Sequence, residues 1–263
     1  MNWWHAAFLG VIEGLTEFLP ISSTFHLIMS GKLLGLAQTE FLKVFEVAIQ
    51  TGGILAVLWL FGPGLLKDKK LIGWLGGSFV VTAIFGLVLH PLIKGVFFES
   101  NWLMVSVFIA VGVGFILLER WLKQNRINLP KTLAELNWND ASLIGLGQAA
   151  AVVPGVSRAG AVIVTMLLLR YRRDEAARYS FLIAAPTIMA AGLLDVAKYY
   201  SNHVATVTDA QLFAVGLVTA FGSAVLVLKW FIGYVQKHTL EIFGIYRLVA
   251  GAGLVVWLLA TGG

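Results

Sequence analysis

Residues 13–26 read Glu-Gly-Leu-Thr-Glu-Phe-Leu-Pro-Ile-Ser-Ser-Thr-Phe-His, and they place two carboxylates, several hydroxyls and an imidazole inside an apolar run. A charged side chain at the centre of a bilayer costs about 2.5–3.5 kcal/mol on insertion scales, so ionisable residues in such a run indicate a functional site. Pro20 disfavours helix at Leu19 and divides the segment from about 6 to 36 into two short pieces. Neither piece is long enough to span a bilayer, so we expect a re-entrant helical hairpin.

The composition is that of a polytopic membrane protein. Of the 263 residues, 59% are hydrophobic and only 13% are charged. A second interrupted segment covers about 141–169 and is broken at Pro154-Gly155. We predict an all-α integral membrane protein, a single membrane domain with six transmembrane helices and two re-entrant hairpins. The six spans are the apolar runs at about 42–61, 73–93, 102–119, 179–195, 211–232 and 243–260, which approach the roughly 20 residues that cross a bilayer and must be helical in lipid.

The basic residues indicate orientation in a membrane rather than binding of nucleic acid. The net charge is +5, but Lys and Arg cluster between the apolar runs, where they suit anionic lipid headgroups. Because successive spans cross the membrane in alternating directions, thirteen of these Lys and Arg residues fall on one side and four on the other. The positive-inside rule then makes the richer side cytoplasmic, so we expect a multi-pass membrane protein, with membrane lipids as its surroundings and no nucleic-acid partner.

The two halves of the chain form a weak internal repeat. Residues 17–23 align with residues 151–157 at an offset of 134, and each proline is followed by a serine three residues later. Three spans separate the two hairpins, so the repeats, about 1–122 and 138–263, would be inverted and their broken tips would meet near the bilayer middle. Broken helices at matching positions of two halves point to a midplane site.

Glu13 and Glu17 form the first candidate site. They are four residues apart, so on a helix they share one face, where two negative charges repel. Either one carboxyl is protonated or a cation bridges them. A hard divalent ion such as Mg²⁺ suits a carboxylate pair that leaves room for water and phosphate oxygens. The alternative is two carboxylates that merely lie near an interface.

The residues after the break suit phosphate chemistry. Ser22, Ser23 and Thr24 stand where a second helix should begin, and the N–H groups of a helix start bind anions. Simple N-capping is the alternative. His26 is the only imidazole of this segment, and its neighbours favour a role as general acid or nucleophile over a structural one.

The second hairpin contains Pro154-Gly155-Val156-Ser157-Arg158. Gly155 permits a tight turn or a close backbone approach. Arg158 offers a planar fork that matches phosphate, and pairing with Glu13 or Glu17 is the alternative for its charge.

Four further polar residues lie in the spans. Glu46 and Gln50 are one helical turn apart and could support the site. Asp195 and Arg247 fall near span ends, where we expect them to reach the interface.

The motifs resemble the two signatures of the undecaprenyl-diphosphate phosphatase family, also called the bacitracin-resistance (BacA/UppP) family. The similarity extends to residues 45–50, 179–182 and 245–247 and covers nearly the whole chain. The resemblance implies inverted repeats with re-entrant hairpins, and removal of the terminal phosphate from a polyprenyl diphosphate, which recycles the cell-wall lipid carrier. It also implies a location in the bacterial (inner) cell membrane. It also implies that the following residues, which match the two family motifs, have functional roles: Glu13, Glu17, Ser23, His26, Ser157 and Arg158.

Three positions depart from the family pattern. Phe25 stands where the family has Gly, Ala159 where it has Ser, and Val162 where it has Thr. Ala159 and Val162 therefore lack two hydroxyls that could contact phosphate. Loss of a hydrogen bond to a charged group typically costs about 1.5–3 kcal/mol, so weakened or altered phosphatase activity is expected. A paralogue that acts on another phospholipid, or a transporter or flippase of polyprenyl phosphate, is the alternative.

The preferred interpretation is metal-assisted hydrolysis of a polyprenyl diphosphate. Glu13 and Glu17 would hold Mg²⁺ or Ca²⁺. Whether His26, Ser23 or water is the nucleophile stays open. Small residues such as Gly112, Gly114, Gly251 and Gly253 would permit close helix packing, and a homodimer is one arrangement that could use it. The predicted catalytic residues are Glu17, His26, Arg158 and Ser23, and the predicted substrate-binding residues are Ser22, Ser23, Thr24, Ser157 and Arg158.

Overall fold

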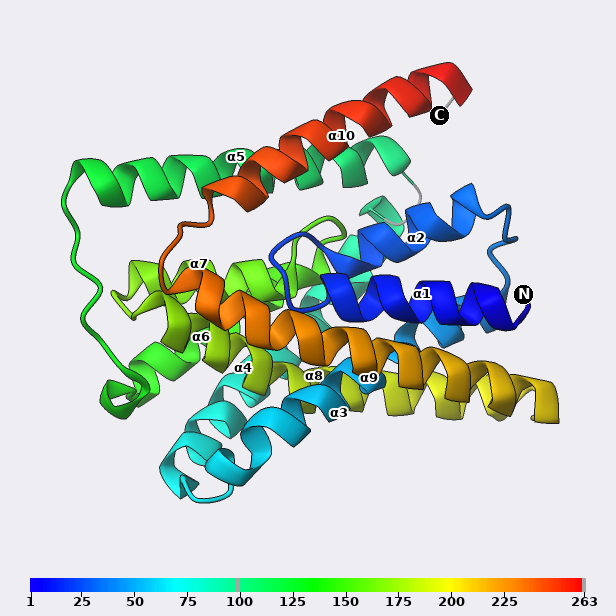
Figure 1. Ribbon diagram of the computed structural model, residues 1–263, viewed down its shortest axis with the longest axis horizontal. Coiled ribbons are helices and arrows are strands. Elements are labelled where there is room, and N and C mark those ends of the chain that lie inside the picture. The colour runs from blue at the N-terminus through cyan, green and yellow to red at the C-terminus, as the bar shows by residue number, and fades with distance from the viewer. Residues whose placement is uncertain (98–99, 262–263) are drawn as a thin grey trace. The chain divides into compact units, whose positions relative to one another are not determined.

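The structure, a computed structural model, describes the backbone of residues 1–97 and 100–261 and the side chains of residues 1–89 and 100–260. Within these ranges the regular structure is helical, apart from one isolated β-bridge (Figure 1). The α-helices are α1 (Trp3–Thr16), α2 (Ser23–Leu33), α3 (Glu40–Leu65), α4 (Lys69–Phe97), α5 (Asn101–Gln124), α6 (Trp138–Ala149), α7 (Arg158–Leu168), α8 (Arg173–Tyr200), α9 (Val207–Val235) and α10 (Glu241–Thr261). Two short 3₁₀ helices are η1 (Leu133–Glu135) and η2 (Ala150–Val152).

Six of the helices are long and apolar enough to cross a membrane, which confirms the predicted spans. They are α3, α4 over Lys69–Leu89, α5, α8, α9 and α10 over Glu241–Ala260. Each contains a window with a mean hydropathy of 1.7 to 2.2. The protein is therefore an all-α, multi-pass membrane protein. The helices begin earlier than the apolar runs because polar residues cap them; at α3 the Thr39 hydroxyl accepts a hydrogen bond from the N–H of Leu42 (3.2 Å).

The remaining α-helices form two pairs of short helices that flank the predicted breaks. Helices α1 and α2 have 14 and 11 residues, and α6 and α7 have 12 and 11, so each is shorter than the roughly 20 residues of a full span. The members of each pair lie side by side (Figure 1). The two interruptions are called the first break (residues 17–22) and the second break (residues 150–157). The re-entrant path through a membrane and the inverted repeat stay predictions.

The chain divides into two compact units, each assembled from three separate segments. Unit 1 contains Met1–Leu19, Ser23–Ile72 and Phe181–Phe231. Unit 2 contains Pro20–Ser22, Gly73–Ser180 and Ile232–Gly263. Each unit takes residues from both halves of the sequence, so neither unit is one of the predicted repeats, and those repeats stay a prediction.

In unit 1 the helix pair α1 and α2 packs on α3 and α9. A buried cluster joins Leu9, Leu27, Phe45 and Leu212 from these four helices. Gly14 lies close to α9, because a Cβ built there would lie 2.3 Å from the carbonyl oxygen of Ala220. The backbone of α1 therefore reaches the backbone of α9 next to Glu13, which fixes the helix that bears the first carboxylates.

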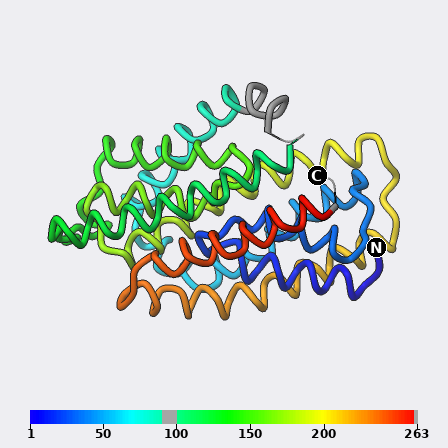
Figure 2. The backbone as a smooth tube through the Cα atoms, turned by 90° about the horizontal axis from the view of Figure 1, so that it is seen from above, coloured from blue at the N-terminus to red at the C-terminus, as the bar shows by residue number. Residues whose placement is uncertain are grey.

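In unit 2 hydroxyl groups join α4 to α6. Ser78 Oγ donates to the carbonyl oxygen of Ala141 (2.6 Å), and Thr82 Oγ1 donates to that of Gly145 (2.9 Å). Helix α5 lies along α10 (Figure 2). A Cβ at Gly112 would lie 3.0 Å from the carbonyl oxygen of Gly244, so these helices cross closely. Some of the small residues noted in the sequence thus pack within the chain, and a homodimer stays untested.

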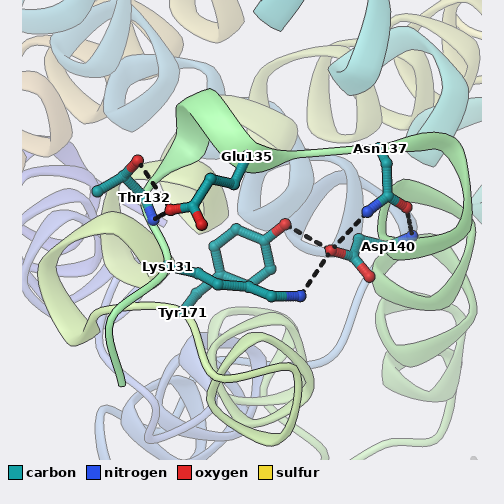
Figure 3. A network of polar contacts seen from close by, with 6 residues as sticks. All are labelled: Lys131, Thr132, Glu135, Asn137, Asp140 and Tyr171. Atoms are coloured by element: carbon teal, nitrogen blue, oxygen red, sulfur yellow. Dashed lines mark hydrogen bonds and ion pairs between the residues drawn. The ribbon is translucent and has the colours of Figure 1, made fainter. Parts of the chain in front are cut away.

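A polar network fixes the end of the second helix pair (Figure 3). Asp140, in the first turn of α6, accepts hydrogen bonds from Tyr171 Oη (2.6 Å), Asn137 Nδ2 (3.1 Å) and Lys131 Nζ (3.3 Å). The backbone of Lys131 also bridges residues 170–172, which follow α7. The chain before α6 is thus fastened to the chain after α7.

Tyr171→Phe tests this network. Loss of a hydrogen bond to a charged group costs about 1.5–3 kcal/mol, so we expect a lower unfolding temperature in detergent at pH 7. Burial and the bond to Asp140 raise the pKa of Tyr171 above its ordinary value. The stabilisation is therefore fully present below the ordinary tyrosine pKa of about 10 and is lost as the pH rises toward the raised value. Equal unfolding temperatures for the two proteins at pH 7 would contradict this assignment.

Candidate functional site

The first carboxylates lie at the end of α1 in unit 1. Glu13 is in the last turn of the helix and Glu17 follows its final residue, with its N–H bonded to the carbonyl oxygen of Glu13 (2.9 Å). The prediction that one helical turn separates them is confirmed. Both residues are buried, with exposed fractions of 0% and 7%. Carboxylates are rarely buried to this degree unless other groups stabilise their charge.

Ser23 provides one such group. It is the first residue of α2, it is buried, and its hydroxyl donates a hydrogen bond to Glu17 Oε2. A serine hydroxyl bonded to a buried carboxylate is an arrangement in which the carboxylate can take the hydroxyl proton. The structure therefore brings two predicted catalytic residues, Ser23 and Glu17, into direct contact.

The residues on either side of Ser23 differ in their exposure to solvent. Ser22 is buried and adopts a left-handed backbone (φ 68°), so the chain turns there before α2 begins, as the sequence predicts. Thr24 is exposed and His26 is half-buried. The buried ring of Phe25 meets the His26 ring edge-on at 5.6 Å, so the residue that departs from the family pattern contacts the predicted acid or nucleophile.

The second break lies in unit 2 and ends in an N-capped helix. The Ser157 hydroxyl accepts a hydrogen bond from the N–H of Gly160 (3.1 Å), which makes Ser157 the N-cap of α7. Arg158 is the first residue of that helix and is partly buried. The cap positions Arg158 beside the N–H groups of the helix start, where an anion is favoured.

Gly155 sits at the tightest point of the second break. Its φ of 95° lies in the left-handed region, and a Cβ there would lie 2.7 Å from the carbonyl oxygen of Met104 and 3.1 Å from the nitrogen of Phe108. The break is therefore pressed against the backbone of α5. Both reasons given for glycine from the sequence, a turn and a close approach, are confirmed.

Arg247 corrects one sequence interpretation. The expectation that it reaches the interface is wrong, because it is fully buried in α10 (exposed fraction 0%). It donates hydrogen bonds to the carbonyl oxygens of Pro20 (2.9 Å), Gly155 (3.0 Å) and Phe108 (3.3 Å). Two of these carbonyls belong to the two breaks. Asp195, by contrast, is exposed as expected.

The two lost hydroxyls fall at fully buried positions. Ala159 and Val162 lie on α7 and have no exposed surface. They differ in this from Arg158, which is partly exposed. Of the supporting residues expected in α3, Glu46 is buried near Gly31 of α2, and Gln50 is partly buried. Their roles stay predictions.

The predicted metal ligands are the carboxylates of Glu13 and Glu17. The described part of the chain holds no group of three or more His, Cys, Asp or Glu side chains that could bind a metal ion. Glu13 and Glu17 nevertheless offer hard oxygen donors one turn apart. Mg²⁺ is commonly held by one or two carboxylates together with waters and substrate phosphates, so the pair fits such an ion when water and phosphate complete its coordination. Binding of Mg²⁺ or Ca²⁺ stays a prediction.

Each unit thus holds one part of the predicted site. Unit 1 contains the Glu17 and Ser23 pair, and unit 2 contains the capped start of α7. Arg247 is the residue that sequence reasoning missed. Its position six residues inside an apolar helix indicated that it could be buried. Its partners could not be predicted in the same way, because they are backbone carbonyls, which every residue has. The predicted residues are distributed as follows: Glu13, Glu17, Ser23, Thr24 and His26 in unit 1, and Ser22, Ser157 and Arg158 in unit 2.

Gly155→Ala tests the close approach of the second break, with Gly35→Ala as its control. Both glycines have positive φ, for which alanine costs about 1–2 kcal/mol. Only Gly155 also has backbone atoms in the way, while nothing lies within 4 Å of a Cβ at Gly35. We expect Gly155→Ala to lower the unfolding temperature clearly more than Gly35→Ala. Equal losses would show that the second break is free to move away from α5.

Comparison with known proteins finds similarity over nearly the whole chain. A family model described as bacitracin resistance protein BacA matches residues 6–253. An undecaprenyl-diphosphatase of Campylobacter fetus subsp. fetus is 44% identical over 260 residues, covering 98% of this chain and 100% of the relative. One from Aquifex aeolicus is 39% identical over 251 residues, covering 95% and 96%. One from a Sulfurihydrogenibium species is 42% identical over 253 residues, covering 96% and 98%.

Proposed function

The chain belongs to the bacitracin resistance protein BacA family, and from this premise we propose that it hydrolyses undecaprenyl diphosphate to the monophosphate and inorganic phosphate. The full-length similarity to proteins named undecaprenyl-diphosphatase supports this substrate. The six apolar spans support a site of action in the bacterial inner membrane. The observation that carries the proposal is the bond between the Ser23 hydroxyl and buried Glu17.

Ser23 is the proposed nucleophile and Glu17 its base. The hydroxyl already donates to the carboxylate, so its proton has an acceptor when the oxygen attacks the terminal phosphorus. The Ser23 O–P bond forms while the bond from the terminal phosphorus to the bridging oxygen breaks. The electron pair of the broken bond leaves with undecaprenyl monophosphate. Water then attacks the phosphoserine, which releases inorganic phosphate and returns the serine hydroxyl.

His26 is suited to the second proton transfer. It is half-buried in the first turn of α2, three residues after Ser23. Residues three apart on a helix are neighbours on one face. An imidazole in this place can protonate the leaving oxygen and afterwards take a proton from the attacking water. Its contact with Phe25 holds the ring on an apolar neighbour, which restricts the orientations that the imidazole can adopt.

The groups proposed to bind phosphate include Arg158 and the start of α7. Arg158 carries a guanidinium fork that matches two phosphate oxygens, and it stands at the N-terminus of α7. The Ser157 hydroxyl caps this helix, so its main effect is to hold Arg158 and the neighbouring N–H groups in place. The proposal assigns to Ser22 and Thr24 the contacts with the outer phosphate oxygens, as predicted from the sequence.

A divalent cation would add charge neutralisation. Glu13 and Glu17 would hold Mg²⁺ or Ca²⁺, which when bound would neutralise charge on the diphosphate. Glu13 is the more deeply buried carboxylate, and the cation would offset the cost of burying it.

Phosphate release from undecaprenyl diphosphate by purified protein in detergent tests the proposal, because transport cannot occur there. We expect release that requires Mg²⁺ or Ca²⁺ and stops with EDTA. Ser23→Ala and Glu17→Gln should each lose at least about 100-fold in kcat, since each removes one member of the nucleophile and base pair. Ser30→Ala, on the same helix, should behave as wild type.

The outcomes separate the alternatives. Hydrolysis that survives Ser23→Ala would remove Ser23 as nucleophile and leave His26 or water. Release that is indifferent to EDTA would remove the cation. No release by the wild type, together with retained binding of the lipid, would replace the phosphatase by a transporter or a non-hydrolysing paralogue.

Arg158→Lys and Arg158→Ala test the phosphate contact. The lysine keeps the charge but not the two parallel donors, so we expect kcat/KM to fall for both variants and further for the alanine. Each lost charge-assisted bond should cost about 1.5–3 kcal/mol of transition-state stabilisation, or roughly tenfold to a hundredfold. Arg120→Ala is the control, because Arg120 makes only an exposed ion pair with Glu241. Full kcat/KM in Arg158→Ala would contradict the assignment.

A further inference from the structure

Arg247 is a fully buried charged residue whose burial the proposed chemistry does not explain. A guanidinium is costly to bury unless hydrogen bonds compensate the lost hydration. Its Nε and Nη1 make three such bonds, and every acceptor is a backbone carbonyl. Two of these acceptors are 227 and 92 residues away in the sequence. The arginine therefore ties together segments that the chain itself does not connect.

The acceptors lie where the helices are interrupted. Pro20 is in the first break, two residues before Ser22, and Gly155 is in the second break, two residues before Ser157. Carbonyls in a break have no helical N–H partner, and lipid offers none. The planar fork of one arginine can serve several of them at once. A single side chain thus fixes the backbone just before a predicted phosphate-binding serine in each break.

The surroundings hold the guanidinium in one place. Its carbon lies 4.7 Å from the centre of the Phe108 ring and 5.3 Å from that of Phe115, which are distances for cation–π contacts. Gly112 leaves room for the stem, since a Cβ there would lie 2.8 Å from Arg247 Cβ. Phe115 also reaches the first turn of α7, where a Cβ at Gly160 would lie 2.7 Å from the ring. Arg247 is thereby coupled to the helix start that carries Arg158.

We propose that Arg247 is a positioning residue, which sets the two breaks in register so that Ser22, at the end of the first break, and the start of α7, capped by Ser157 at the end of the second, bind one diphosphate. This inference rests on the proposed phosphatase function. It differs from a purely structural role, in which the arginine would stabilise the fold without affecting turnover by the folded protein. Small displacements of reacting groups, of about 1 Å, can cost about 100-fold in rate, so positioning predicts a large effect on kcat.

The test compares Arg247→Met, Arg247→Lys and the control Glu119→Gln. Glu119 is also buried in unit 2 and joins Arg173 to the N–H of Leu240, but it has no part in the proposed chemistry. Turnover of undecaprenyl diphosphate is measured per folded protein, with kcat and KM determined separately. Amide hydrogen exchange is followed in peptides that cover residues 19–24 and 152–158, as a readout that needs no activity.

We expect Arg247→Met to lower kcat by about 100-fold with little change in KM, and to speed exchange in both peptides. Arg247→Lys should recover part of the loss, because an ammonium group can serve some of the carbonyls but not in the planar arrangement of the fork. Glu119→Gln should lower the unfolding temperature and keep wild-type kcat and wild-type exchange in both peptides.

Wild-type kcat in folded Arg247→Met would overturn the proposal. So would a loss of kcat in Glu119→Gln that matches the loss in Arg247→Met, because instability alone would then explain both. If Arg247→Met does not fold, Arg247→Lys decides: slower turnover with faster exchange in both peptides supports the proposal, and wild-type values reject it. If the wild type releases no phosphate, the phosphatase function fails, and the exchange data still report whether Arg247 holds both breaks.

Discussion

A helix that stops inside a membrane leaves backbone groups without partners, because hydrocarbon supplies neither donors nor acceptors. This chain has two helix interruptions, at Pro20 and at Pro154-Gly155, and the sequence predicts that both lie inside the membrane. Arg247 satisfies one carbonyl in each of them, and the Ser157 hydroxyl caps the helix that follows the second. The breaks can therefore exist only where particular polar side chains meet them, and the apolar helices around the breaks serve to hold those side chains in place.

The same constraint explains why the breaks are suited to the proposed chemistry. Groups that complete a broken backbone are polar, buried and fixed, which are the properties that a site for phosphoryl transfer needs. Glu17 illustrates the link, because its N–H continues the hydrogen bonding of α1 while its carboxylate accepts the Ser23 hydroxyl. Structure and proposed catalysis thus use different atoms of one residue. In the second break Ser157 caps the helix that places Arg158.

Much of this arrangement could be predicted from local sequence. Hydropathy located the six spans, and a proline between short apolar pieces located both breaks. The spacing of Glu13 and Glu17 gave their shared helical turn. These features depend on residues near one another in the chain, so one sequence is enough to predict them. The family resemblance added the substrate class and the roles of single residues.

The features that sequence reasoning missed depend on distant backbone. Arg247 was assigned to an interface because its position in the apolar run gave no sign of the carbonyls it would meet. The Asp140 and Tyr171 contact likewise joins residues on either side of a helix pair. The full coordination of a metal ion could not be predicted from the sequence for another reason. Two carboxylates provide only part of that coordination, and the remaining ligands would be water and substrate, which are not part of the protein chain.

The position of Arg247 in the last helix has a consequence for biosynthesis. A ribosome makes Pro20 early and Gly155 about midway, whereas α10 emerges only after the other five spans. Until then the nascent chain carries both signature motifs in the membrane, but nothing from α10 joins their carbonyls. The hydrogen bonds to the two breaks are therefore completed only after α10 has been made. An unfinished chain would already carry the Ser23 hydroxyl and the Glu17 carboxylate, yet would still lack the arginine that joins a carbonyl of each break.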